Sequence, residues 1–166
     1  MAVVGCGTTV KVYDQGPVDL TQAGAHAGQA PLVLVYRTNF REKEHQIFFW
    51  TADKERINVK IPVGASTSEG VLIYLPVKQS YALSGMLVLR NGNWNDLSFG
   101  TDLPLFNLHA DQLTQLSYFE VNLQPDDWTF SMIKTKPTAQ DLYLGAFRKR
   151  FQYQGPIHSV DALNLR

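Results

Sequence analysis

Apolar residues along the chain fall mainly into short runs with the two-residue period of β-strands. Arg56–Ile61 alternates strictly, which places Ile57, Val59 and Ile61 on one face of a strand. Leu32–Tyr36 is a continuous β-prone run of the kind found in a central strand. Other runs with strand character are Ile47–Trp50, Val71–Leu75, Tyr81–Arg90, Trp94–Phe99, Tyr118–Leu123, Trp128–Lys134 and Asp141–Phe147.

Turn signals separate these runs at intervals typical of an all-β domain. Asn91-Gly92 is a tight-turn pair between two β-prone runs and predicts a hairpin. Leu108–Leu116 is the only stretch with helical character, because two of its leucines fall at helical spacing. In Asp141–Phe147, Gly145 is expected to form a β-bulge. About eight short strands with frequent turns predict an antiparallel β-sandwich or a small barrel.

The composition changes along the chain and suggests three parts. Residues 1–30 are rich in Thr, Gly, Ala and Gln and are typical of a flexible tether. Residues 31–154 contain the strand runs and would form the sandwich, and residues 155–166 would form a C-terminal tail. An N-terminus with a first strand at Val10–Tyr13 is the alternative to the tether.

Charge and composition narrow the possible functions. Among 166 residues, 15 basic side chains balance 15 acidic ones, which gives no electrostatic support for nucleic-acid binding. The hydrophobic share of 45% is typical of a globular protein. Cys6 is the single cysteine, so no intramolecular disulfide can form. No apolar run approaches the roughly 20 residues that span a bilayer.

The first residues of the chain partly match a dinucleotide-binding loop. Gly5 and Gly7 begin the pattern G-x-G-x-x-G, but Val10 occupies the position of the third glycine. That loop must also lead into a helix, and Gly16-Pro17 breaks the chain where the helix would run. The sequence therefore predicts no dinucleotide cofactor.

The stretch Val3-Val4-Gly5-Cys6 resembles the lipobox of bacterial lipoproteins, in which a small residue precedes the acylated cysteine. The resemblance implies cleavage before Cys6 and attachment of diacylglycerol to its sulfur, where two or more acyl chains give stable anchoring. It also implies a basic and apolar signal segment upstream of Met1. Gly7 is compatible with export to the outer membrane. The stretches LPVKQSYALSGMLV, YFEVNLQP and LYLGAF are arranged as in small Gram-negative lipoproteins, over about half the chain.

Residues with catalytic or metal-binding chemistry show no recognised spacing. No nucleophile or phosphate-loop motif is present, and the adjacent acids Asp126-Asp127 are typical of a turn. The histidines form no pair with metal-ligand spacing; they are His26, His45, His109 and His158. We therefore expect no enzyme activity, no metal and no cofactor.

Two stretches are candidates for contact with a partner. Phe48, Phe49 and Trp50 place apolar groups on both faces of one strand, so either another layer or a partner must cover the second face. Arg148-Lys149-Arg150 lies among aromatic residues. In a strand, Lys149 would share a face with the aromatics, and the charges would block edge pairing or meet an anionic partner.

Together these features predict a non-enzymatic binding or scaffolding domain. It would be held by lipid at Cys6 on the periplasmic face of the outer membrane, and it would serve a secretion, pilus or envelope assembly. Its partner would be an unidentified protein of that assembly. The alternatives are a soluble β-sandwich subunit of a larger particle, such as a phage or secretion apparatus, and a small enzyme.

Overall fold

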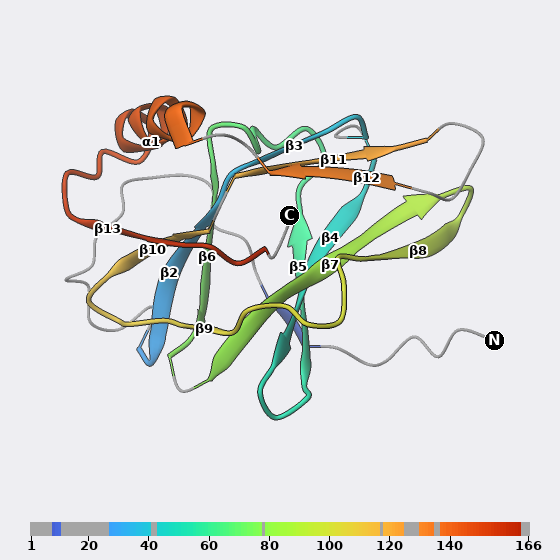
Figure 1. Ribbon diagram of the computed structural model, residues 1–166, viewed down its shortest axis with the longest axis horizontal. Coiled ribbons are helices and arrows are strands. Elements are labelled where there is room, and N and C mark those ends of the chain that lie inside the picture. The colour runs from blue at the N-terminus through green and yellow to red at the C-terminus, as the bar shows by residue number, and fades with distance from the viewer. Residues whose placement is uncertain are drawn as a thin grey trace.

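A computed structural model of the protein describes residues 8–10, 27–40, 43–77, 79–116, 118–124, 130–134 and 137–163. These residues form a β-sandwich with one short helix (Figure 1). The expected all-β sandwich is confirmed, and the described strands do not close into a barrel.

Three sheets build the sandwich. Sheet A contains, in order across the sheet, β1 (Thr8–Val10), β5 (Arg56–Ile61), β4 (His45–Thr51), β7 (Ser80–Arg90) and β8 (Asn93–Ser98), and β9 (Phe106–Asn107) also pairs with β7. Sheet B contains β13 (Ile157–Val160), β10 (Leu113–Leu116), β2 (Gln29–Leu34) and β6 (Val71–Pro76). Sheet C contains β12 (Phe130–Lys134), β11 (Phe119–Leu123) and β3 (Tyr36–Thr38).

The strand pairings are mixed and not antiparallel throughout. The hairpin of β7 and β8 is confirmed, and both of its turn residues, Asn91 and Gly92, have positive φ angles of 51° and 77°, as a twisted two-residue turn requires. However, β10 lies parallel to both β2 and β13, β11 lies parallel to β3, and β1 lies parallel to β5. Since β3 follows β2 and β11 follows β10, the two parallel partners pass together from sheet B into sheet C.

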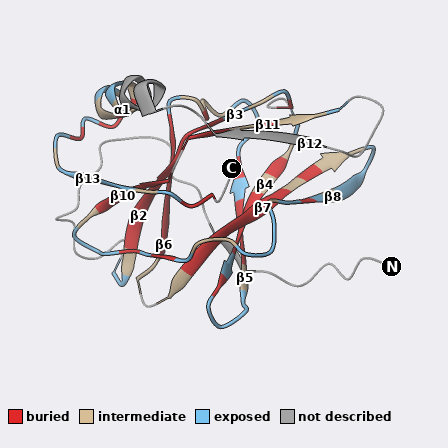
Figure 2. Cartoon of the chain, in the orientation of Figure 1, coloured by how far each residue is buried: buried red, intermediate tan, exposed pale blue. Residues whose placement is uncertain are grey.

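The main core lies between sheet A and the two other sheets. The alternation predicted for Arg56–Ile61 is present in β5, where Ile57, Val59 and Ile61 all contribute to this core. Tyr36 of β3 stacks on Phe119 of β11, with 5.4 Å between ring centroids. Figure 2 shows the buried residues running along β2, β4, β6 and β7, whereas β8 is largely exposed.

A second apolar cluster lies on the outer face of sheet B. Leu32 and Leu34 of β2 point into the main core, whereas Val33 and Val35 contact the second cluster. Phe147 of α1 (Pro137–Arg150) and Phe151 cover that cluster, with ring centroids 4.7 Å apart. Thus β2 is buried on both faces and lies between β10 and β6, as expected of a central strand, although the predicted run Leu32–Tyr36 continues into β3.

The segment Asp141–Phe147 belongs to this helix, so its predicted strand is wrong. Its residues are not β-branched, Pro137 occupies the first helical position, and three basic residues fill the last turn. Phe147 and Phe151 are four residues apart, which places both on one side of a helix. Gly145 is therefore a helical residue and forms no β-bulge.

The segment Leu108–Leu116 is not a helix, contrary to the expectation from its spacing. Residues 113–116 form β10 between β2 and β13. Residues three apart lie on opposite faces of a strand. Accordingly, Leu116 packs in the main core and Leu113 in the second cluster.

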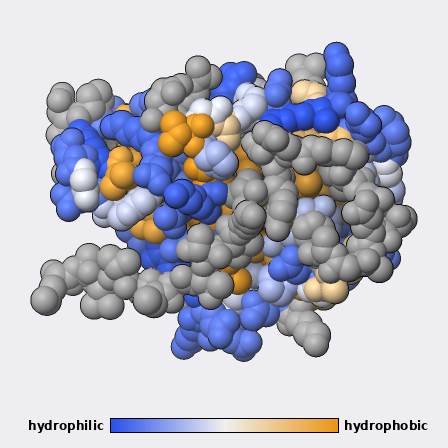
Figure 3. Space-filling view, turned by 180° about the vertical axis from the view of Figure 1, so that it is seen from behind, coloured by the Kyte–Doolittle hydropathy of each residue, from blue (hydrophilic) through white to orange (hydrophobic). Residues whose placement is uncertain are grey.

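The segments outside the predicted sandwich also contribute to it. Strand β13 pairs with β10, and Ala162 and Leu163 are buried in the main core. At the other end of the chain, the backbone of Thr8–Val10 pairs with β5. The one described helix is too short to cross a membrane. Seen from behind, small hydrophobic areas lie between larger hydrophilic ones on the described surface (Figure 3).

Candidate interaction surface

The outer face of sheet A is the face turned away from the main core. Its residues alternate along each strand with the core residues, because successive side chains of a strand point to opposite sides. They are Gln46, Phe48 and Trp50 on β4, Arg56, Asn58 and Lys60 on β5, Gly85, Leu87 and Leu89 on β7, and Trp94 and Asp96 on β8.

Phe48 lies at the centre of this face and is only 3% exposed. Its ring fits against Gly85 of β7, where an added Cβ would collide with the ring and with the Leu97 carbonyl oxygen. The Arg56 guanidinium covers the ring, with its central carbon 3.8 Å from the ring centroid. Phe48 is therefore buried by its own neighbours.

Arg56 joins three strands across the face. Its Nη1 donates to the Asp96 carboxylate on β8 at 3.0 Å, and its Nε donates to Asn58 Oδ1 on β5 at 3.1 Å. Its Nη2 is buried and has no hydrogen-bond partner. Stacking on Phe48 brings the cation close to the negative face of the ring, an interaction worth about 0.5–2 kcal/mol.

Of the predicted contact stretch on β4, only Trp50 presents a large exposed surface. Phe49 is fully buried in the main core, beside Tyr81 and Phe106. Trp50 is 41% exposed. A second tryptophan, Trp94 of β8, is 39% exposed at the other end of the same face, next to the hairpin turn.

A groove of about 410 Å³ lies beside Trp50 and is called the Trp50 groove below. An irregularity in the pairing of β4 with β7 places Ser84 there as an extra residue, and its Oγ accepts a hydrogen bond from the Trp50 backbone N–H. Bulges of this kind often lie next to functional sites. The groove is lined by Trp50, Lys54, Ala82, Ser84, Gly100, Thr101, Leu103 and Leu105.

A second groove, of about 630 Å³, lies at the hairpin end of sheet A and is called the hairpin groove below. It is formed by the segment before β4, the end of β5 with the residues after it, and the β7–β8 turn. Its lining residues are Lys43, Glu44, Lys60, Ile61, Pro62, Val63, Leu89, Arg90, Asn91 and Gly92.

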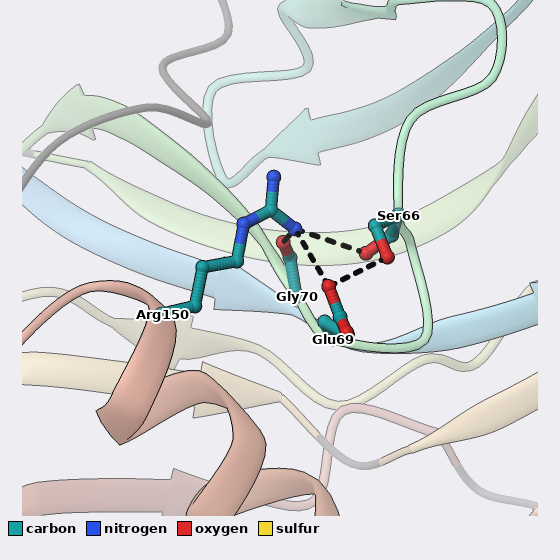
Figure 4. Close-up of polar contacts among 4 residues, drawn as sticks. All are labelled: Ser66, Glu69, Gly70 and Arg150. Carbon is teal, nitrogen blue, oxygen red and sulfur yellow. Dashed lines mark hydrogen bonds and ion pairs between the residues drawn. The ribbon is translucent and has the colours of Figure 1, made fainter.

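The basic cluster of the sequence lies at the other side of the molecule, in the last turn of α1. Arg150 Nη1 donates to the carbonyl oxygens of Ser66 and Gly70, both at 3.3 Å, and pairs with Glu69 at 3.7 Å (Figure 4). Arg148 donates to the Gly155 carbonyl oxygen at 2.8 Å. These residues lie in a helix, so the arrangement considered for them in a strand does not apply, and two of the three charges bind backbone oxygens of the chain itself. Of the three residues, Lys149 alone is exposed, and the two arginines are partly buried.

A buried hydrogen-bond chain connects sheets C and A and ends at Lys43, one of the residues that line the hairpin groove. The Tyr36 hydroxyl donates to His45 Nε2 at 2.8 Å, and His45 Nδ1–H donates to the Lys43 carbonyl oxygen at 3.1 Å. This arrangement satisfies a neutral imidazole, and burial lowers the pKa of His45 below its ordinary 6.5. Burial raises the pKa of Tyr36. Both groups lie inside the fold, away from solvent.

The remaining candidate residues do not gather into a site. His109 and His158 are exposed on separate segments. Among the described residues, no group of three His, Cys, Asp or Glu side chains could hold a metal ion. Cys6, the rest of Val3–Cys6, His26 and Asp126-Asp127 lie outside the described residues.

Comparison of the chain with protein-family models, curated proteins and solved structures gives no match.

Sequence reasoning missed Trp94 and both grooves. A signal for Trp94 was present, because it lies two residues after the Gly92 turn, at a position that alternates with the core residue Leu97. The grooves gave no signal, because each combines residues from segments that are far apart in the sequence.

Proposed function

We propose that the protein is a non-enzymatic binding domain that holds a protein partner on the outer face of sheet A. The observation that carries this proposal is the exposure of Trp50 and Trp94 on that face. Tryptophan supplies a large apolar contact at low entropic cost and is enriched in the energetically important centres of protein interfaces.

The form of the face supports a binding role. Phe48 and Arg56 are held in fixed positions by Gly85, Asn58 and Asp96, so the centre of the face is rigid. A groove lies near each end. A preorganised surface loses little conformational entropy on association, which favours binding.

We further propose that the domain is anchored in the outer membrane through lipid on Cys6, as an accessory lipoprotein of an envelope or secretion assembly. The support is the lipobox-like Val3-Val4-Gly5-Cys6. Anchoring would raise the local concentration of the domain beside its partner and so increase the apparent affinity. The intact mass of the native protein tests this part: mass added at Cys6 by diacylglycerol and acyl chains is expected, and an unmodified Cys6 would contradict it.

Site-specific photo-crosslinking in the producing cells tests the binding role. A photoreactive residue is placed at Trp50, at Trp94 or, as the control on the other side of the molecule, at Lys149. We expect crosslinks to a protein from the two sheet A positions and none from Lys149. Crosslinks from Lys149 alone would contradict the assignment of the face. If the purified protein elutes as a large oligomer in size-exclusion chromatography, the result would instead favour the alternative of a particle subunit.

A further inference from the structure

The hairpin groove differs from the Trp50 groove in its charge. Its lining includes three basic residues, Lys43, Lys60 and Arg90, and one acidic residue, Glu44. The Trp50 groove has a single charged lining residue, Lys54. Because the whole chain carries no net charge, the excess of positive charge in the hairpin groove is a local feature.

The one acidic residue of the groove forms an ion pair in which a carboxylate of the ligand can take its place. Lys60 Nζ lies 3.1 Å from Glu44 Oε1, and the two side chains are 58% and 37% exposed. Exposed ion pairs of this kind contribute little to stability. A carboxylate that enters the groove can therefore take the place of Glu44 beside Lys60, while Lys43 is exposed on the adjoining segment.

Apolar residues lie among these charges. Val63, which follows β5, is 55% exposed, and Pro62 and Leu89 complete an apolar part of the lining. The volume of about 630 Å³ is in the range of sites that accept small ligands or a few amino-acid side chains. A matching ligand therefore presents carboxylates next to apolar side chains.

We propose that the hairpin groove binds an acidic segment of the partner protein, in which Asp or Glu alternates with apolar residues. This inference rests on the proposed binding function of sheet A. The carboxylates of such a segment would meet Lys43 and Lys60, and its apolar side chains would meet Val63 and Leu89, all of which line the same groove. A membrane surface is broad and flat, and a small concave groove on an electrically neutral chain fits it poorly.

Fluorescence anisotropy with labelled ten-residue peptides tests this inference on the purified protein. In the three probes, Leu alternates with Glu, with Gln or with Lys. We expect binding of the Glu peptide alone, with an affinity that falls between about 0.1 M and 1 M salt as the screening length shrinks from about 10 Å to 3 Å. Equal binding of the three peptides, or no binding of the Glu peptide, would overturn the proposal.

Two charge variants should change the affinity for the Glu peptide in opposite directions, which a loss of folding could not do. Lys60→Gln should weaken binding of the Glu peptide about two- to fivefold, and Glu44→Gln should strengthen it by a similar factor, since it leaves Lys60 without its internal partner. The matched control Lys149→Gln, at the end of α1 on the other side of the molecule, should leave the affinity unchanged. Unchanged affinity in both hairpin-groove variants would sink the proposal.

Two further results show whether the inference about the hairpin groove or the proposed binding function of sheet A is wrong. Binding to phosphatidylglycerol vesicles without binding to the Glu peptide would replace the acidic segment by a lipid surface and overturn the inference. Crosslinks from Trp50 and Trp94 without peptide binding would also overturn it, while the proposed binding function of sheet A would stand. Peptide binding without those crosslinks would contradict that function and leave the groove as a separate site.

Discussion

The outer faces of sheets A and B each bury a phenylalanine against a glycine, but they cover it differently. On sheet B the aromatic residue is Phe147, which α1 lays beside Gly70, and Arg150 fixes the helix end to the adjoining loop. On sheet A it is Phe48, which comes from the sheet itself and is covered by Arg56. A helix packs on the outer face of sheet B, whereas a single side chain covers the centre of the outer face of sheet A.

This difference is the reason for proposing the outer face of sheet A, and not that of sheet B, as the surface for a partner. On sheet B, Phe147 of the helix and Phe151 and Tyr153 after it pack in the second cluster, whose residues are all buried. On sheet A, a single arginine protects Phe48 and leaves Trp50 and Trp94 exposed. Among the described residues, no helix covers the outer face of sheet A, which is one support for the proposal that this face binds a partner.

The largest effect should come from removing the aromatic residue that covers sheet B. Phe147→Ala should lower the free energy of unfolding by about 3–5 kcal/mol, because Phe147 is fully buried and its loss opens a cavity. Chemical denaturation with guanidinium measures the change. A loss below about 1 kcal/mol would mean that the helix contributes little to the fold, and the contrast between the faces would fail.

The two glycines test the packing of the two phenylalanines directly. Gly85→Ala should destabilise the protein by about 1–3 kcal/mol, because the added methyl group displaces Phe48. Gly70→Ala should have a similar cost, since its φ of 108° disfavours a side chain and its Cβ would lie 3.0 Å from both Phe147 and Val33. Hydrogen exchange should show loosening of β8 in the first variant and of α1 in the second. Loosening of α1 in Gly85→Ala and of β8 in Gly70→Ala would contradict the packing described for the two phenylalanines.

Removing the cover of Phe48 should cost less than removing Phe147. Arg56→Ala should destabilise the protein by about 1–2 kcal/mol through loss of the ring contact and of its hydrogen bonds. The control Asp96→Ala should cost less than about 1 kcal/mol, since that carboxylate is half exposed. Thermal unfolding compares the two, and equal effects would mean that the ion pair, and not the contact with Phe48, holds Arg56.

His45 supplies a test of the fold that is independent of either outer face, because its hydrogen bond with Tyr36 joins sheet A to sheet C inside the protein. Since burial lowers the pKa of His45, the folded state favours the neutral imidazole. Its contribution to stability is complete above about pH 6.5 and decreases as the pH falls below 6.5 towards the lowered pKa. Denaturation between pH 5 and 7.5 should show this slope in the native protein and a smaller one in His45→Gln. An identical slope in both would exclude His45 as its source.

The smallest effect on stability belongs to the exposed tryptophans. Trp50→Ala and Trp94→Ala should each change the free energy of unfolding by about 1 kcal/mol or less, because each residue lies at the surface with about two fifths of its area exposed. Their effect should instead appear in binding, where loss of an interface tryptophan costs about 2 kcal/mol or more. If either tryptophan variant unfolds, its indole ring is needed for the stability of the fold.

The secondary structure could be predicted from the sequence where a single local pattern determines the conformation of a segment. The alternation of Arg56–Ile61, the double burial of Leu32–Tyr36 and the Asn91-Gly92 hairpin are all present in the structure. The strand predicted for Asp141–Phe147 failed, because its apolar residues match a strand or a helix and tertiary packing of Phe147 decides between them. The burial of Phe48 on the same face as the exposed Trp50 depends on Arg56 and Gly85, which no local pattern identifies.

Oxidative footprinting of the two exposed tryptophans tests the central claim most directly. Hydroxyl radicals are applied to the purified protein and to intact producing cells, and oxidation of Trp50 and Trp94 is measured by mass spectrometry. We predict that both indoles are oxidised readily in the purified protein and protected in the cells, where the partner covers sheet A. Equal oxidation in the two settings would contradict the claim that this face binds a partner.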